Sequence, residues 1–303
     1  MLTKSTLLTI LALFLFSISQ ARNDSHKSSK IKVLIVDGFS NHDWQETTRV
    51  VMDLLDDTDL FQVSVSTAPP TAGSEGWDTW RPAFSDYDVV IQNCNNIGGG
   101  PTWPREVETD LEKYVQKGGG LYILHSANNA FPHWKEYDLM IGLGWRDADG
   151  GWALTINEDG SPMRIPPGEG RGTYHGPRVD AVIQTLGSHP IHKDFPPKWL
   201  TPNLEVYKYA RGPAENLDVI SFSFDQETEK NWPIEWVIKY GKGKVYNSTF
   251  GHVWKGEEYP ETMRCVGIQT TLIRALEWLA TGKVSWSLPD PFPSETEFVI
   301  KPL

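Results

Sequence analysis

Residues 118–131 read GGGLYILHSANNAF, a short apolar run that leaves a glycine cluster and leads directly into His125, Ser126 and Asn128. In open α/β sheets, ligands and reactive side chains gather at the carboxyl ends of the strands. The stretch therefore predicts a buried strand of an α/β sheet, and it places His125 where chemistry is expected.

Two other apolar runs lead into a histidine in the same way. Residues 31–36 (IKVLIV) precede His42, and residues 244–249 (KVYNST) precede His252. A single histidine of this kind is usually structural or lies on the surface. Three of them after strand-like runs favour one shared polar site.

Residues 1–21 contain one lysine, an apolar centre and small residues near Ala21. This order is typical of a secretory signal peptide, and the apolar run is short for a membrane span. We expect a secreted or periplasmic protein with no membrane attachment after cleavage. The polar residues 22–30 are expected to form a flexible leader before the first strand.

The acidic balance of the chain, with a formal net charge of −11, argues against nucleic acid or an anionic membrane as the main partner. Residues 31–284 are long enough for one large α/β domain. Cys94 and Cys265 are the only cysteines, which is too few for a disulfide framework. We expect them to act as packing residues, and the sequence leaves open whether they pair.

Strand and helix patterns alternate through the first half of the chain. Residues 61–66 and 87–92 are expected to be strands, and a helix is expected to follow Pro104 and to stop at the glycine cluster. Asp43 has the spacing of a capping box for an earlier helix. This β-α-β order predicts parallel strands with their carboxyl ends at one edge.

The second half is less regular. Residues 132–180 are rich in Gly, Pro and Trp, and predict a loop-rich insertion or lid. A last helix is expected over residues 260–281, followed by a proline-rich tail over residues 285–303. Alternating patterns predict further strands at 179–183, 204–209, 219–224 and 234–239.

Tryptophan is abundant, with 13 residues, several of them in segments rich in Gly and Pro. Most are expected to anchor loops or to fill the core. A flat aromatic face on a loop also suits the CH-rich face of a sugar ring. Trp254, close to His252, is therefore a candidate for carbohydrate binding.

Five segments of the sequence carry a family resemblance. They are HDW at 42–44, GGGLYILHSA at 118–127, SHPI at 188–191, LEVY at 204–207 and PIEWVIKYGKGKVYNSTFGH at 233–252. Together they resemble the ThuA-like (trehalose utilisation) family, a branch of the class I glutamine amidotransferase-like superfamily. The resemblance implies a flavodoxin-like three-layer α/β fold with a mainly parallel central sheet. It also implies a role in carbohydrate metabolism, including oxidised (3-keto) sugars and glycosides.

The superfamily places a nucleophilic cysteine at the strand-to-helix elbow that corresponds to His125 and Ser126. No cysteine occurs there in this chain, so glutamine hydrolysis through a thiolate is not expected. Ser126 is a poor nucleophile candidate, because adjacent residues at an extended strand end point to opposite sides. We instead expect histidine-based hydrolysis, elimination or isomerisation of a carbohydrate, or non-catalytic sugar binding by an accessory protein.

The candidate catalytic residues are His125, Glu205 and His252. His42, His125 and His252 are also candidate ligands for a divalent metal such as zinc, although no local ligand spacing is present and a metal-free acid/base pocket remains open. No phosphate-binding glycine motif indicates a nucleotide cofactor. The candidate substrate-binding residues are Asp37, Trp44, Ser126, Asn128, His175, Tyr207 and Trp254.

The remaining histidines are given structural or surface roles. His189 precedes a proline and is expected to serve a turn. His26, His133 and His192 are expected to lie on the surface.

Overall fold

One mixed sheet of twelve strands organises the computed structural model, which describes residues 29–301. Its main path runs β2-β1-β3-β4-β12-β11-β10-β7-β8, and β5, β6 and β9 form a side branch from β11. The predicted signal peptide, residues 1–21, and leader residues 22–28 lie outside the described residues.

The first half of the main path is parallel. This arrangement confirms the predicted β-α-β order, and it puts five carboxyl strand ends at one edge of the sheet. The strands are β2 (Phe61–Thr67), β1 (Ile31–Asp37), β3 (Val89–Gln92), β4 (Gly120–Leu124) and β12 (Gly243–Ser248).

The other strands pair antiparallel, so the prediction of a mainly parallel sheet is wrong. Short connections, such as the turn at 241–242, leave no room for the helical crossover that parallel neighbours require. The antiparallel strands are β5 (Trp152–Ile156), β6 (Pro162–Ile165), β7 (Val179–Thr185), β8 (Lys198–Leu204), β9 (Arg211–Gly212), β10 (Leu217–Asp225) and β11 (Lys230–Tyr240).

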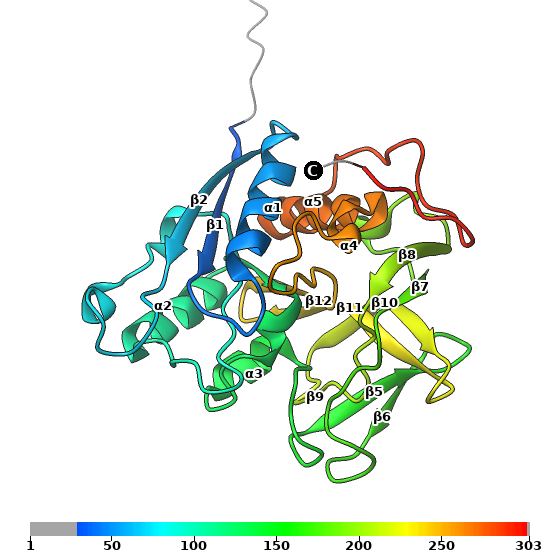
Figure 1. Cartoon of the computed structure of the whole chain (residues 1–303), viewed down its shortest axis with the longest axis horizontal. Helices are drawn as coiled ribbons and strands as arrows, with labels where there is room; N and C mark the ends of the chain where they lie inside the picture. The colour runs from blue at the N-terminus through cyan, green and yellow to red at the C-terminus, as the bar shows by residue number, and fades with distance from the viewer. Residues whose placement is uncertain (1–28, 302–303) are drawn as a thin grey trace, which may run out of the picture.

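Helices cover both faces of the sheet and give three layers (Figure 1). α1 (Trp44–Asp56) and α5 (Val266–Thr281) pack on one face, and α2 (Arg105–Gln116) and α3 (Lys135–Ile141) pack on the other. The remaining helical segments are α4 (Glu261–Arg264), η1 (Trp77–Thr79), η2 (Phe84–Asp86), η3 (His125–Asn129) and η4 (Pro190–His192).

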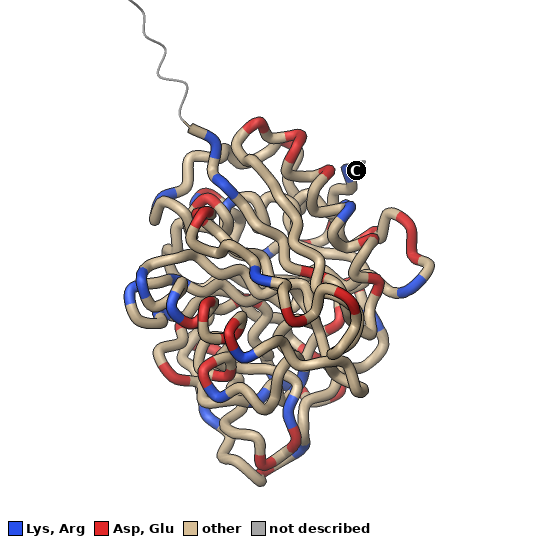
Figure 2. The backbone as a smooth tube through the Cα atoms, turned by 90° about the vertical axis from the view of Figure 1, so that its left-hand side faces the viewer, with Lys and Arg blue, Asp and Glu red and all other residues tan. Residues whose placement is uncertain are grey.

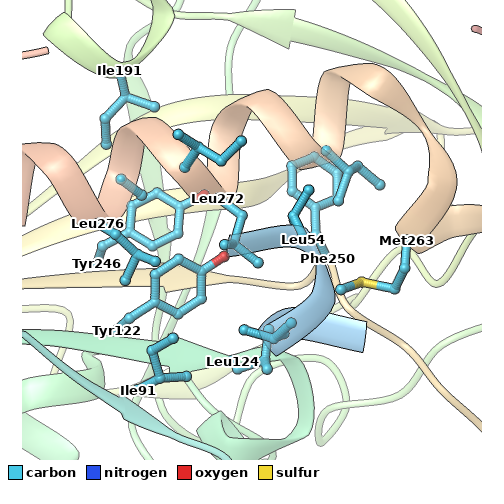
Figure 3. Close-up of a cluster of buried hydrophobic side chains, with 14 of the residues drawn as sticks. Leu54, Ile91, Tyr122, Leu124, Ile191, Tyr246, Phe250, Met263, Leu272 and Leu276 are labelled. Atoms are coloured by element: carbon cyan, nitrogen blue, oxygen red, sulfur yellow. The ribbon is translucent and has the colours of Figure 1, made fainter. Parts of the chain in front are cut away.

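The core beneath α5 holds the two central strands together (Figure 3). Tyr122 of β4 and Tyr246 of β12 are buried side by side, with ring centroids 4.7 Å apart. Leu272 and Leu276 of α5 belong to the same cluster. Close packing of this kind resists small shifts, so it fixes the relative position of the two strands that lead into His125 and His252.

Several elements of the second half of the chain differ in detail from those expected. Residues 132–180 include α3, β5 and β6 among their loops. β8 ends at Leu204, so the expected strand at 204–209 is wrong. The segment that follows pairs through an isolated bridge between Lys208 and Tyr174, which does not extend into a strand. The expected last helix is divided at Cys265 into α4 and α5.

The tail is tied to the body by backbone contacts. The Leu200 N–H donates to the Ser294 carbonyl at 2.7 Å, and Cys265 forms a β-bridge with Ile300. Cys94 and Cys265 are both buried and free.

Acidic and basic residues are interspersed along the backbone shown in Figure 2. Within residues 29–301, no helix has the length and apolar character needed to cross a membrane.

Candidate functional site

The centre of the site is the turn after β4. His125 begins η3 with a φ of 44°, so the chain here is a tight turn and the expected extended end at Ser126 is wrong. Gly251, with a φ of 106°, crosses close by. A Cβ on Gly251 would lie 2.8 Å from Leu124 Cδ1 and 3.4 Å from His125 Cβ. The close approach of β4 to the segment after β12 therefore requires glycine at this position.

Three histidines meet at this edge of the sheet. His42 follows β1, His125 follows β4 and His252 follows β12. Their ring centroids lie 5.0–5.2 Å apart in edge-to-face arrangements. All three side chains are buried. The structure thus brings together the residues that the sequence places after separate strands.

Two of the rings have a fixed orientation. His125 Nδ1 lies 2.7 Å from the Thr249 carbonyl, which can only accept, so Nδ1 carries the proton and Nε2 keeps its lone pair. His42 Nδ1 lies 2.8 Å from Asn41 Oδ1 in the same manner. Such acceptors behind a histidine are typical of metal ligands and catalytic bases.

Glu205 completes the group from the antiparallel half. One of its oxygens, Oε1, lies 3.2 Å from His252 Nε2 and 3.6 Å from His175 Nε2, and the other, Oε2, lies 3.6 Å from His125 Nε2. The segment after β8 keeps its alternation, so Glu205 and Tyr207 line this cavity while Val206 and Lys208 line a second one behind it.

Burial controls the protonation of these groups. It lowers the pKa of His42 to about 3, helped by the neighbouring histidines, and it lowers the pKa of His125 well below the usual range. Burial and the Arg178 cation lower the pKa of His252 to about 4. Burial raises the pKa of Glu205. At neutral pH the three imidazoles are therefore neutral and free to ligate a metal.

Four side chains of the described residues form a group that could hold a metal ion. His42, His125, Glu205 and His252 each offer one ligand atom, and these atoms all lie within 4.8 Å of one another. Three imidazole nitrogens and a carboxylate oxygen suit zinc or a similar divalent cation.

An open cavity of about 460 Å³ lies above this group. The Trp254 ring stacks on His252 at an interplanar angle of 11°, and Trp145 meets His175 and Tyr207 edge to face. Aromatic faces and polar groups together suit a sugar. The lining residues are Asn41, His42, Ile97, Asn129, Trp145, His175, Arg178, Glu205, Tyr207, His252 and Trp254.

The rim carries charged residues that the sequence did not single out. Arg178 lines the cavity, and its Nη2 lies 2.6 Å from Glu257 Oε1. Asn41, Asn129 and Trp145 also line the cavity without having been chosen as site residues. These residues lie in loops and turns, where no periodic pattern marks the direction of a side chain.

Four predicted substrate-binding residues do not line the cavity. Asp37 is buried and accepts a hydrogen bond from Thr48 Oγ1 at 2.7 Å. Trp44 begins α1. Ser126 and Asn128 are buried within η3, and neither amide atom of Asn128 has a hydrogen-bond partner among residues 29–301.

The remaining histidines have structural contacts. His192 is buried, with Nε2 3.1 Å from a Glu235 oxygen, so its prediction as a surface residue is wrong. His189 accepts from the Ile191 N–H at the start of η4, in agreement with a turn role. His133 is partly exposed and contacts Glu108, whereas His26 lies outside the described residues.

Comparisons with known proteins agree on one family. The ThuA family model, described as trehalose utilisation, matches residues 32–279. A solved ThuA-like protein from Parabacteroides merdae is 31% identical, with a TM-score of 0.83, covering 90% of this chain and 98% of its own. A second, from Bacteroides uniformis, is 14% identical, with a TM-score of 0.53, covering 84% and 94% respectively, and shows the fold alone. No curated protein matches the sequence.

Proposed function

This chain belongs to the ThuA family, described as trehalose utilisation, and on that premise we propose that it acts on a glycoside or its oxidised 3-keto form with the help of a divalent metal such as zinc. The supporting observation is the buried group of His42, His125, Glu205 and His252 below an open cavity with aromatic walls. The three histidines would hold the metal, which leaves the carboxylate of Glu205 to accept a proton. A metal bound there would polarise a sugar carbonyl or a pair of neighbouring hydroxyls.

Proton transfer is assigned to Glu205 and His175. The raised pKa of Glu205, caused by burial, makes its carboxylate a stronger proton acceptor than an exposed one. His175 Nε2 lies 3.6 Å from Glu205 Oε1, and its side chain is 36% exposed. His175 can therefore pass a proton between Glu205 and solvent.

Two reaction types begin with removal of a proton next to a carbonyl. In a 3-keto glycoside, the carbon between the carbonyl and the glycosidic carbon carries an acidic proton. Glu205 removes this proton, the electron pair forms a C=C bond, the glycosidic C–O bond breaks, and the leaving oxygen takes a proton. Isomerisation uses the same first step, with the proton returned to another atom. Hydrolysis would instead direct a water molecule to the glycosidic carbon.

The alternative is a carbohydrate-binding or accessory protein without turnover. Trp145 and Trp254 favour it, because both rings line the cavity and would hold a sugar whether or not a reaction follows.

Residues 1–21 support export, because their pattern is that of a secretory signal peptide. Cell fractionation combined with N-terminal sequencing of the recovered protein tests this. Recovery of the full-length chain from the cytoplasm would contradict export.

The first experiment is elemental analysis of the purified mature protein before and after chelation, together with turnover of trehalose and its 3-keto derivative. We expect near-stoichiometric metal, loss of turnover on chelation and recovery when the metal is returned. Absence of metal from active protein would overturn the metal-assisted mechanism. Sugar binding without turnover of either compound would favour the accessory protein.

A further inference from the structure

His252 differs from the other two histidines of the ligand group. Its Nδ1 faces two groups of opposite character, Arg178 Nη1 at 3.4 Å and Glu257 Oε2 at 3.8 Å. Behind His42 and His125, the neighbour of Nδ1 is an oxygen that accepts. The tautomer of His252 therefore depends on whether Nδ1 contacts Arg178 or Glu257.

The contact with Arg178 fixes one tautomer. A guanidinium only donates, so the Nδ1 that it contacts must carry the lone pair, and the proton must be on Nε2. Nε2 then donates to Glu205 Oε1, 3.2 Å away. In this tautomer Nε2 has no lone pair for a metal ion.

We infer that Glu257 is a positioning residue that makes His252 a metal ligand, and that Arg178 holds His252 in the tautomer that cannot ligate. The inference rests on the proposed metal-assisted function. Ligation through Nε2 requires the proton on Nε2 to leave and a proton to bind at Nδ1, so the ring stays neutral. The new Nδ1–H then needs an acceptor, and a carboxylate oxygen of Glu257 lies 3.8 Å away.

Existing contacts hold Glu257 ready for this role. Its Oε2 accepts the Trp254 N–H at 2.9 Å, and its Oε1 contacts Arg178 Nη2 at 2.6 Å. A carboxylate oxygen can accept two hydrogen bonds, so Oε2 can take the proton of His252 without releasing Trp254. Charge acts in the same direction, because a carboxylate favours a nearby divalent cation and a guanidinium opposes it.

The test compares metal affinity in Glu257→Ala and Arg178→Ala, measured by competition with a chromophoric chelator for Zn²⁺. We expect Glu257→Ala to weaken binding by about 10–100-fold, and Arg178→Ala to tighten it by about 3–10-fold. Glu257→Gln, which keeps an acceptor oxygen, should fall between wild type and Glu257→Ala. Glu258→Ala, at an exposed position of the same loop, is the matched control for the loss of a carboxylate.

The inference requires the two substitutions to change Zn²⁺ affinity in opposite directions. Both substitutions break the same ion pair, so a role limited to holding the loops would change affinity in one direction. If Zn²⁺ affinity changed in the same direction in both variants, or in neither of them, the inference would be overturned while the metal site itself would stand. Failure of the wild type to bind Zn²⁺ would instead overturn the proposed function. Nitrogen NMR of the metal-free protein should show Nε2–H on His252 and a gain of Nδ1–H in Arg178→Ala.

Discussion

The two sides of the cavity are built in different ways. The histidine side consists of His42, His252 and Glu205, which line the cavity, and of His125, which packs against the two histidine rings. It is buried, and its histidines follow strands of the parallel half. The loop side, formed by Trp145, His175, Arg178 and Trp254, is more exposed, with Trp254 at 46%. Rigid elements hold groups that need a fixed geometry, whereas loops adapt to the parts of a ligand that vary. The difference assigns reaction chemistry to one side and recognition to the other.

The largest expected effect is on the histidine side. His125→Ala should release the metal and lower turnover by about 10²–10⁴-fold, because it removes a ligand atom from the centre of the group. Elemental analysis and steady-state kinetics measure both. His133→Ala, which removes a histidine outside the cavity, is the matched control. Full metal content in His125→Ala would contradict the assignment.

Acid should destabilise the histidine side selectively. The pKa of His42 is lowered from 6.5 to about 3 and that of His252 to about 4. Between pH 6.5 and about 4, the unfolded chain binds more protons than the folded protein at these groups, so the free energy of unfolding falls as pH falls. The expected loss is on the order of 3 kcal/mol for each of the two histidines.

Urea unfolding of the metal-free protein at several pH values between 7.5 and 4.5 would measure this slope. Replacing His42 by Gln should flatten the curve. An equal slope in wild type and His42→Gln would refute the assignment of acid sensitivity to the histidine side.

The same contrast explains what the sequence could predict. His42, His125 and His252 were found because parallel strands bring their carboxyl ends to one edge, which strand patterns reveal. Arg178 and Trp145 were missed because loop geometry sets the direction of their side chains. The antiparallel half was missed for a related reason, since strand patterns alone do not give the pairing partner, and only the connections separate the two directions.

On the loop side, we expect a smaller effect on affinity alone. Trp145→Ala should raise the dissociation constant for a sugar ligand by about 5–10-fold, since stacking contributes about 1 kcal/mol. Metal content should stay at the wild-type level, because Trp145 offers no ligand atom. Isothermal titration of the sugar and elemental analysis of the same sample measure the two quantities, with Trp145→Phe as the variant that retains an aromatic face. Loss of metal in Trp145→Ala would remove the distinction between the two sides.

The smallest expected effect concerns the helix that follows His42. Asp43 caps α1 by accepting the Glu46 N–H at 3.1 Å, and its own N–H donates to the Val253 carbonyl at 3.1 Å. Asp43→Ala removes the side-chain cap and a longer contact, in which Asp43 Oδ2 accepts the Gly256 N–H at 3.5 Å. It should lower the free energy of unfolding by about 1 kcal/mol. Because the backbone contact to Val253 remains, His42 and His252 keep their relative position and the metal affinity should not change. Asp43→Asn retains a capping oxygen and should recover most of the stability. A fall in metal affinity in Asp43→Ala, absent from Asp43→Asn, would show that the histidine side depends on the helix cap as well as on the strand ends.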